Sequence, residues 1–452
     1  MLVAGKNALV LGMARSGLAA AEFLSGKGAQ VKVSDKRKEQ ELQTEIGFLR
    51  KLGIGYEVGG HAEGSFLAAD FVVVSPGVPL SLPLLKKASQ AGKEVISEIE
   101  LASRFLQGRM VGITGSNGKT TTTTLVGEIL KAAGFSVQVG GNIGTALSSL
   151  VERSTPETIT AVELSSFQLE AMPTLRPDVA VLLNITPDHL DRYNSFEEYA
   201  RAKLNILANQ RSSDFAVLNM DDEFLRRFRE QAHSEVYGFS TKGEVTRGTY
   251  LKGNQLIFAS GTEKEMVICL EAIRLRGRHN LENIAAAITA ARLVNAPSIK
   301  IAETLKQFRG VEHRLELVAE IKGISFYNDS KATNTDATAK ALESFDNRIV
   351  LILGGRDKGS DFTVLSSLIR QHVRSVVLIG EATEKIGYQL KGTVPMVEAA
   401  NLDEATQVAF ERARCGDVVL LAPACASFDM FQNYEHRGRA FKEAVQRLKE
   451  KS

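Results

Sequence analysis

Tryptophan is absent from this chain of 452 residues, and only three cysteines are present. Cys269, Cys415 and Cys425 lie far apart and form no CxxC pair, so neither a disulfide framework nor a thiolate zinc site is expected. Unpaired cysteines are typical of a reducing compartment, and we therefore expect a cytoplasmic protein. With aromatic residues at 6%, the composition gives no indication of nucleobase stacking.

A strong charge of one sign and long apolar runs are also lacking. Fifty-five basic residues face 53 acidic residues, so no bulk attraction to nucleic acid or to an anionic membrane is expected. No stretch of about 18 apolar residues predicts a membrane span. Lys6, Arg15 and Glu22 interrupt the apolar start of the chain, which therefore does not resemble a secretory signal.

What is present is an ordinary globular composition, with 44% hydrophobic and 24% charged residues. A chain of this length favours two to four domains. Strand-like apolar runs alternate with helix-like segments throughout, which is typical of α/β folds with parallel sheets. We expect a small Rossmann-like domain over residues 1–107, a central domain with a parallel sheet over 108–310, and a doubly wound, Rossmann-like domain over 311–452.

The predicted strands end in polar or glycine-containing loops. They are Ala8–Leu11, Gln30–Ser34, Phe71–Val74, Met110–Ile113, Thr158–Val162, Val179–Asn184, Val350–Leu353, Val376–Ile379 and Asp417–Leu421. Helices are expected over Gly17–Leu24, Thr120–Ala133 and Asn280–Leu293. Because ligands of such sheets bind outside the carboxyl ends of the strands, the polar loops are the candidate binding segments.

One of these loops, Gly115–Thr120, follows a predicted strand and opens a predicted helix. Glycines let successive backbone N–H groups turn toward one anion, and the helix N-terminus adds partial positive charge. Lys119 is placed to reach the β- and γ-phosphates, and Thr120 to ligate Mg²⁺. The general phosphate-loop pattern requires glycine at position 113, where Ile113 stands, so only its second half matches.

Two further residues are candidate magnesium ligands, because Mg²⁺ prefers oxygen ligands and phosphate. Glu163 ends a predicted strand, and His189 follows another. Taken alone, Glu163 is more often a solvated acid at a strand end, and His189 an ordinary loop histidine. Their shared position at strand ends beside the phosphate loop favours a metal role for both. Lys203, from its helical context alone, is expected on the helix surface.

Nine sequence blocks in order make the resemblance specific. They are TGSNGKTTT (114–122), GNIG (141–144), ELSSFQLE (163–170), TPDHLDRY (186–193), RHNLEN (278–283), HR (313–314), NDSKATN (328–334), GGRDKGSDF (354–362) and PACASFDMFQNYEHRG (423–438). Together they resemble the Mur ligase family, whose phosphate loops do not require glycine at position 113. The last three blocks resemble the member of the family that adds D-glutamate.

The resemblance implies ATP-dependent ligation of D-glutamate to UDP-N-acetylmuramoyl-L-alanine through an acyl phosphate, in peptidoglycan precursor synthesis. Its cofactors would be ATP and Mg²⁺, and Lys203 would be carbamylated. Its partners would be the two substrates, without nucleic acid or a membrane. A monomer is expected. The first domain would bind the UDP-sugar, the central domain ATP, and the third domain the amino acid.

The resemblance also implies roles for individual residues. Lys119, His189 and Lys203 would be catalytic, and Thr120, Glu163, His189 and Lys203 would hold the metal. ATP would contact Gly115, Ser116, Asn117, Gly118, Lys119, Thr120, Thr121, Asn142, Asn280, Asn283, Arg314, Asp329 and Lys331. The UDP-sugar would contact Arg15, Ser16, Asp35, Arg37, Gly77, Asn142, Ser165 and His189. D-glutamate would contact Thr333, Lys358, Ser427 and Tyr434. Arg15 and Tyr434 depart from the residues usual in the family.

Three alternatives remain open. The segment Leu11–Gly17 imitates the fingerprint of an NAD(P)-dependent dehydrogenase, but Ala14 stands where a second glycine is needed. A nucleotide-gated binding protein would use the phosphate loop as a switch. The third alternative is a sibling ligase, meaning either another Mur ligase that adds L-alanine, a diamino acid or a dipeptide, or a folylpolyglutamate synthase.

Overall fold

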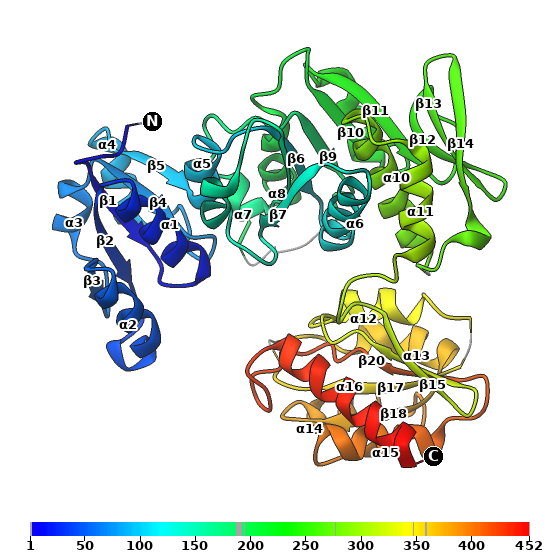
Figure 1. Cartoon of the computed structure of the whole chain (residues 1–452). Coiled ribbons are helices and arrows are strands. Elements are labelled where there is room, and N and C mark those ends of the chain that lie inside the picture. The colour runs from blue at the N-terminus through cyan, green and yellow to red at the C-terminus, as the bar shows by residue number, and fades with distance from the viewer. Residues whose placement is uncertain are drawn as a thin grey trace. The chain divides into compact units, whose positions relative to one another are not determined.

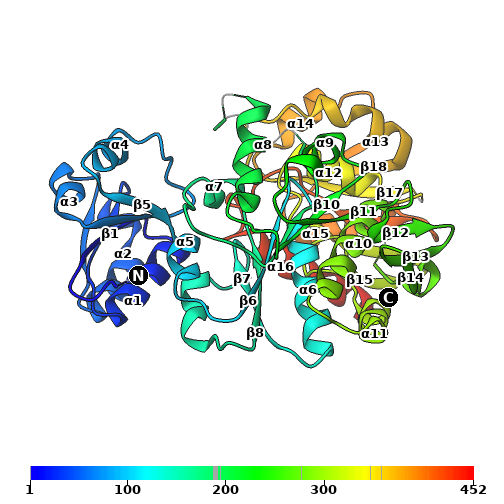
Figure 2. The same ribbon diagram turned by 90° about the horizontal axis from the view of Figure 1, so that it is seen from above.

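The computed structural model describes residues 2–186, 192–193, 195–275, 277–346, 348–357 and 359–451, with Arg278 and His279 described by their backbone only. Three separate sheets of five, nine and six strands form the fold. The chain divides into two compact units, residues 1–273 with 279–307 and residues 274–278 with 308–452. The elements are labelled in two views (Figures 1 and 2). Among the described residues, no helix is long and apolar enough to cross a membrane.

The first sheet is entirely parallel, in the order β3-β2-β1-β4-β5. Its strands are β1 (Asn7–Leu11), β2 (Gln30–Asp35), β3 (Gly55–Val58), β4 (Phe71–Val74) and β5 (Glu94–Ser97), and its helices are α1 (Arg15–Gly26), α2 (Gln43–Lys51), α3 (Glu63–Ala68), α4 (Pro83–Gln90) and α5 (Glu98–Ser103). Strands β1 and β4 are almost wholly apolar and lie buried at the centre of the sheet, as the unbroken apolar runs predict. This strand order is Rossmann-like, as expected.

The second sheet has the order β14-β13-β12-β11-β10-β9-β6-β8-β7. Its strands are β6 (Arg109–Thr114), β7 (Ser136–Gly141), β8 (Thr158–Glu163), β9 (Val179–Leu182), β10 (Phe215–Asn219), β11 (Glu235–Ser240), β12 (Arg247–Lys252), β13 (Gln255–Ser260) and β14 (Glu263–Cys269). Its helices are α6 (Lys119–Ala132), α7 (Ser166–Leu169), α8 (Phe196–Leu204), α9 (Glu223–Phe228), α10 (Arg278–Leu293) and α11 (Ser298–Gln307). Helix α11 lies close to β14 in both views (Figures 1 and 2).

The central sheet is mainly parallel, as expected, and it carries an antiparallel edge that was not predicted from the sequence. Strands β12, β13 and β14 are joined by two tight hairpins and pair antiparallel at one edge of the sheet. The two-residue connections Gly253–Asn254 and Gly261–Thr262 permit these turns because both glycines have positive φ. The parallel part of the sheet, from β7 to β12, carries the phosphate loop.

The third sheet has the order β15-β16-β20-β17-β18-β19 and is parallel except for the β15–β16 hairpin. Its strands are β15 (Glu316–Ile321), β16 (Ile324–Asn328), β17 (Ile349–Gly354), β18 (Val373–Ile379), β19 (Met396–Glu398) and β20 (Val418–Leu421). Its helices are α12 (Thr335–Leu342), α13 (Ser366–His372), α14 (Thr383–Gln389), α15 (Leu402–Arg412) and α16 (Tyr434–Lys451). Two apolar clusters, one on each face of this sheet, form its core.

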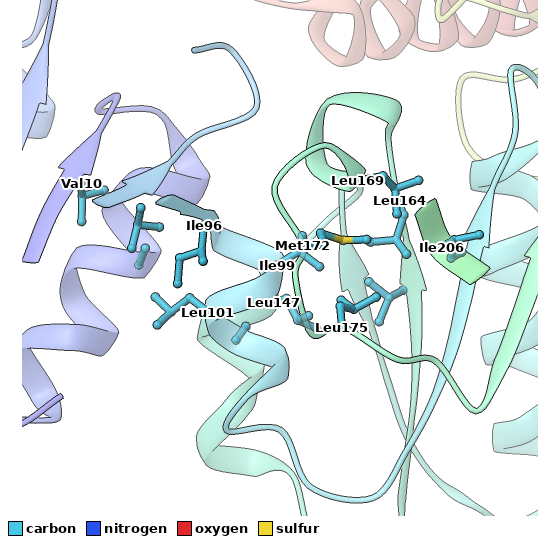
Figure 3. Close-up of a cluster of buried hydrophobic side chains, with 14 of the residues drawn as sticks. Val10, Ile96, Ile99, Leu101, Leu147, Leu164, Leu169, Met172, Leu175 and Ile206 are labelled. Carbon is cyan, nitrogen blue, oxygen red and sulfur yellow. The ribbon is translucent and has the colours of Figure 1, made fainter. Parts of the chain in front are cut away.

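Helix α5 anchors the first sheet to the second. Its apolar residues Ile99 and Leu101 belong to the same buried cluster as Leu147 and Met172 of the central domain (Figure 3). The carboxylate of Glu100, in the same helix, is fully buried and accepts hydrogen bonds from the backbone N–H groups of Thr174 (3.2 Å) and Leu175 (2.8 Å). The first two domains therefore share one continuous core.

Candidate functional site

Asn184, in the segment after strand β9, accepts two hydrogen bonds from the phosphate loop between β6 and α6. The backbone N–H of Ser116 donates to the carbonyl of Asn184 (2.9 Å), and the N–H of Asn117 to its side-chain oxygen (2.8 Å). Gly118, the N-cap of α6, has a φ of 85°. A Cβ at that position would lie 2.0 Å from Oδ1 of Asn283, so only glycine fits. The loop therefore combines a tight backbone with a helix N-terminus, which suits an anion.

Two lysines converge on one carbonyl oxygen of this loop. Nζ of Lys119 donates to the carbonyls of Gly115 (2.8 Å) and Ser116 (2.9 Å). Nζ of Lys203, from α8, donates to the same Gly115 carbonyl (2.9 Å) and lies 4.7 Å from the ring centroid of Tyr199. The expectation of a surface position for Lys203 was wrong, because only 2% of this residue is exposed. Tertiary contacts of α8 with the loop bury the side chain.

Glu163, at the end of β8, lies on the strand next to β6 and is buried. Its Oε1 accepts a hydrogen bond from the amide of Asn142 (2.8 Å). Its Oε2 is buried and has no hydrogen-bond partner among the described residues. A buried carboxylate oxygen of this kind is costly unless it binds a cation or a proton. Thr120 is buried in the first turn of α6, and Thr121 follows it.

Two predicted site residues, His189 and Lys358, lie outside the described residues. Asn280 and Asn283 lie buried in the first turns of α10, where the Asn283 amide donates to Oδ1 of Asn280 (3.1 Å). Because Asn283 also touches Gly118, the structure brings this pair to the phosphate loop.

The candidate UDP-sugar residues of the first domain lie at the carboxyl ends of its strands. Asp35 ends β2, and its carboxylate accepts from the backbone N–H of Met13 (2.8 Å) and from the guanidinium of Arg37 (2.8 Å). Burial by itself would raise the pKa of Asp35, but these hydrogen bonds lower it to about 2. Asp35 therefore stays ionised and fixes Arg37 beside the β1–α1 turn.

Arg15 and Ser16 open helix α1, and Gly77 follows β4 in an exposed turn. The guanidinium of Arg15 donates to the carbonyl of Asn142 (3.1 Å), so this turn reaches the residue that holds Glu163. In the central domain Ser165 caps α7 in a capping box with Gln168. Arg15 of the first domain therefore contacts Asn142 of the central domain, and both are candidate UDP-sugar residues.

In the second unit, one buried guanidinium joins three segments. Arg437, on α16, donates to Oγ of Ser330 (2.9 Å) and to the carbonyls of Cys425 (3.1 Å) and Ala426 (3.3 Å). Burial lowers the pKa of Arg437 to about 10, which still leaves the group charged at neutral pH. The segments that it ties together carry the candidate residues Lys331, Thr333, Ser427 and Tyr434.

Within this cluster, Nζ of Lys331 lies 5.8 Å from the ring centroid of Tyr434, and Ser427 is buried. Asp329 precedes Lys331 by two residues, and burial raises its pKa to about 6 although the charges of Arg314 and Lys331 oppose that rise. The structure thus gathers the predicted residues of the third domain, other than Lys358, around the carboxyl ends of β16 and β20.

Comparisons with known proteins agree along the whole chain. Family models match at residues 6–97 (Mur ligase MurD-like, N-terminal domain), 113–291 (Mur ligase middle domain) and 313–425 (Mur ligase, glutamate ligase domain). A protein of Koribacter versatilis named UDP-N-acetylmuramoylalanine–D-glutamate ligase is 48% identical over 100% of this chain and 99% of its own. The protein of the same name from Acidobacterium capsulatum is 49% identical over 98% and 97%.

The chain belongs to the Mur ligase family. This Mur ligase is therefore an ATP-dependent enzyme that forms a C–N bond. Membership of this family excludes the dehydrogenase alternative. Solved structures share the three-domain fold: UDP-N-acetylmuramate-alanine ligase MurC of Thermotoga maritima matches with a TM-score of 0.61 at 21% identity, covering 98% of this chain and 100% of that one. The MurF ligase of the same organism, solved in complex with ADP, matches with a TM-score of 0.60 at 18% identity, covering 92% and 95%.

Sequence reasoning missed several residues that shape the site of this Mur ligase. Tyr199 places its hydroxyl 2.9 Å from Oγ of Ser116, and Asn184 holds the phosphate loop from the neighbouring strand. Arg437 organises the loops of the third domain, and Arg192 contacts the first. Arg192 and Arg437 lie inside sequence blocks that pointed to the family, but spacing alone predicted no role for either side chain.

Proposed function

We propose that this Mur ligase joins D-glutamate to UDP-N-acetylmuramoyl-L-alanine while ATP is converted to ADP and phosphate, a step of peptidoglycan precursor synthesis. The observation that carries the proposal is full-length identity of 45–49% to relatives named for this reaction. The clustering of Lys331, Thr333, Ser427 and Tyr434 supports it, since the first two lie within the segment that matches a glutamate ligase model and the last two follow that segment. Lys358, outside the described residues, completes the proposed D-glutamate site.

The reaction needs an activated acyl group. The carboxylate of the L-alanyl residue attacks the γ-phosphorus of ATP, ADP leaves, and an acyl phosphate forms. The neutral amine of D-glutamate then attacks the acyl carbon and the bond to phosphate breaks. The departing phosphate takes up the proton that the amine loses, and the amide remains. Lys119 and the N-terminus of α6 would stabilise the charge on the phosphates in the first step, because fixed cations and dipoles dominate phosphoryl transfer.

A magnesium site fits the residues around Glu163. The unpartnered buried oxygen of Glu163 and the Thr120 hydroxyl are hard oxygen donors beside a phosphate loop, which is the donor set that Mg²⁺ prefers. We propose His189, outside the described residues, as a further ligand. The bound ion would neutralise charge on the β- and γ-phosphates; Lys119 and the loop would orient the same phosphates.

The surroundings of Lys203 support the proposal that this lysine is carbamylated. Two ammonium groups, those of Lys119 and Lys203, donate to one carbonyl oxygen in a buried setting, where like charges repel strongly. Conversion of the Lys203 amine to an N-carboxylate would replace that repulsion by attraction and would supply a further anionic oxygen for the metal. We propose this modification for Lys203.

We assign the UDP-sugar to Arg15, Ser16, Asp35, Arg37 and Gly77 of the first domain together with Asn142 and Ser165 of the second. The adenosine and phosphates of ATP would contact Asn280, Asn283, Arg314, Asp329 and Lys331. We further propose that the protein is a cytoplasmic monomer that binds neither nucleic acid nor a membrane.

The test is a coupled assay of the purified protein with MgATP, UDP-N-acetylmuramoyl-L-alanine and a panel of amino acids. We expect ADP, phosphate and a new amide only when D-glutamate is present. Preference for L-alanine, a diamino acid or a dipeptide would identify a sibling ligase instead. Absence of ADP with all three substrates would refute the proposal.

A further inference from the structure

Arg192 makes contacts in two domains. Its guanidinium carbon lies 3.8 Å from the ring centroid of Phe167 in the central domain. Its Nη1 donates to the carbonyl of Pro76 in the first domain (2.9 Å), and its Nη2 lies 3.5 Å from the carbonyl of Val78. Only 20% of this side chain is exposed, so the charge is held in a defined place.

The two segments that Arg192 connects carry different parts of the proposed UDP-sugar site. Pro76 and Val78 flank Gly77, which belongs to the first domain. Phe167 lies on α7, which is capped by Ser165 of the central domain. Arg192 therefore lies between the two halves of the site, one in each domain.

The remaining contacts fix the orientation of the guanidinium. Oε2 of Glu170 lies 3.6 Å from its Nη2 and balances the charge. Oε1 of Glu170 accepts from the Tyr193 hydroxyl (2.5 Å), and the Tyr193 ring stacks on Phe167 with centroids 6.0 Å apart. Burial first, and the hydrogen bond to Glu170 second, raise the pKa of Tyr193. The phenol therefore remains a neutral donor at physiological pH and keeps Glu170 in place.

We propose that Arg192 is a positioning residue for the sugar nucleotide. It sets the separation between the Gly77 turn and helix α7, so that the L-alanyl carboxylate is presented to the γ-phosphate of ATP. The inference rests on the proposed function and adds a residue that determines binding of one substrate. A fixed separation keeps the two halves of the site at the distance that the bound nucleotide spans, so loss of this bridge should weaken binding of that substrate.

Lysine should not replace arginine here. A guanidinium stacks on an aromatic ring with its face while its edge donates parallel hydrogen bonds, whereas an ammonium is a compact point charge. Arg192→Lys keeps the charge beside Glu170 but loses the bridge between Phe167 and Pro76. Arg192→Gln loses the charge as well.

The experiment measures steady-state kinetics of both variants with each substrate varied in turn. We expect the KM for UDP-N-acetylmuramoyl-L-alanine to rise about tenfold, which corresponds to about 1.4 kcal/mol. The KM values for ATP and D-glutamate should stay within about twofold of wild type, since Lys119 and the third domain are untouched. Arg176→Gln is the matched control, because Arg176 is also partly buried and faces one carboxylate, that of Asp214 (3.5 Å), just before β9 begins.

A purely structural role would move all three KM values together or lower kcat alone, and either result would overturn the inference. Wild-type kinetics in Arg192→Lys would overturn it as well. Calorimetric measurement of the equilibrium binding of UDP-N-acetylmuramoyl-L-alanine distinguishes failure of the proposed function from failure of the role of Arg192. If wild-type protein neither binds this nucleotide nor turns over, the proposed function fails; if it does both and Arg192→Gln binds equally tightly, only the role of Arg192 fails.

Discussion

The side chains of the proposed metal and phosphate site depend on one another. Arg15 holds the carbonyl of Asn142, Asn142 holds one oxygen of Glu163, and the other oxygen of Glu163 has no partner among the described residues. Lys119 and Lys203 meet at Gly115. Because these side chains are proposed to bind charged ligands and lie outside the apolar cores, a substitution of Lys119 should affect chemistry far more than folding.

Lys119→Ala tests that expectation directly. Loss of the ammonium from the proposed phosphate site should lower kcat by about a thousandfold or more, since a positioned cation stabilises the transition state. The melting temperature should stay close to that of wild type. Lys131→Ala, on an exposed position of the same helix, should be fully active. Wild-type turnover by Lys119→Ala would contradict the role assigned here.

The raised pKa of Asp329 implies that the stability of the folded protein depends on pH. Its pKa is raised from 3.8 to about 6 in the folded state, so its favourable contribution is complete below pH 3.8 and is lost as the pH rises through 6. Above that pH a buried carboxylate costs up to about 3 kcal/mol. Asp329→Asn should therefore raise the free energy of unfolding at pH 8 and much less at pH 4, while activity falls if Asp329 contacts ATP.

Denaturant unfolding at pH 4 and pH 8 measures this difference. Asp336→Asn is the control, because Asp336 is exposed on α12 and pairs with Lys340 across one helical turn. If Asp329→Asn changed the free energy of unfolding equally at both pH values, the pKa of Asp329 would not be raised in the folded protein.

At the scale of elements, short segments decide how domains are joined. Helix α5 has only six residues, yet its Glu98 accepts from the Ser148 backbone N–H (2.7 Å) and its Glu100 from two central-domain N–H groups. The carboxylate of Glu100 also pairs with Arg104 (2.8 Å), and hydrogen bonds to an ionised carboxylate are stronger than neutral ones. They make α5 the element that fixes the first domain to the second.

Glu100→Gln should weaken that attachment. An amide NH₂ group would face the backbone N–H groups of Thr174 and Leu175 or the guanidinium of Arg104, and breaking a buried charged pair costs about 3 kcal/mol. Thermal unfolding of the first unit should shift downward accordingly. Glu63→Gln, at an exposed ion pair with Lys87, should change stability by less than about 1 kcal/mol. Similar small shifts for both variants would argue against an anchoring role for α5.

At the scale of the whole molecule, the separate cores predict two unfolding transitions. The first two domains share a buried cluster that includes Leu101 (Figure 3), whereas Leu353 belongs to a cluster within the second unit. Leu101→Ala and Leu353→Ala should each cost about 2–5 kcal/mol. Calorimetry should show each variant lowering a different transition. A single transition that both variants lower together would mean that the units unfold as one.

Most of the fold could be predicted from the sequence, since the buried strands are unbroken apolar runs. Phe71–Val74 was predicted as the structure shows it, and Ala8–Leu11 and Met110–Ile113 each lie within a strand only slightly longer than predicted. The antiparallel strands β12–β14 were missed because their apolar and polar residues alternate weakly, although Gly253–Asn254 is a hairpin signal.

The order of motifs along the chain determined the family and the residue types available to hold phosphate, because those depend on local spacing. Only the tertiary structure decided which side chains meet. Lys203 is buried because α8 packs against the phosphate loop, and Arg192 reaches Pro76 because two domains share a core. Such contacts join residues 88 and 116 positions apart, and no local periodicity carries information about a neighbour at that distance.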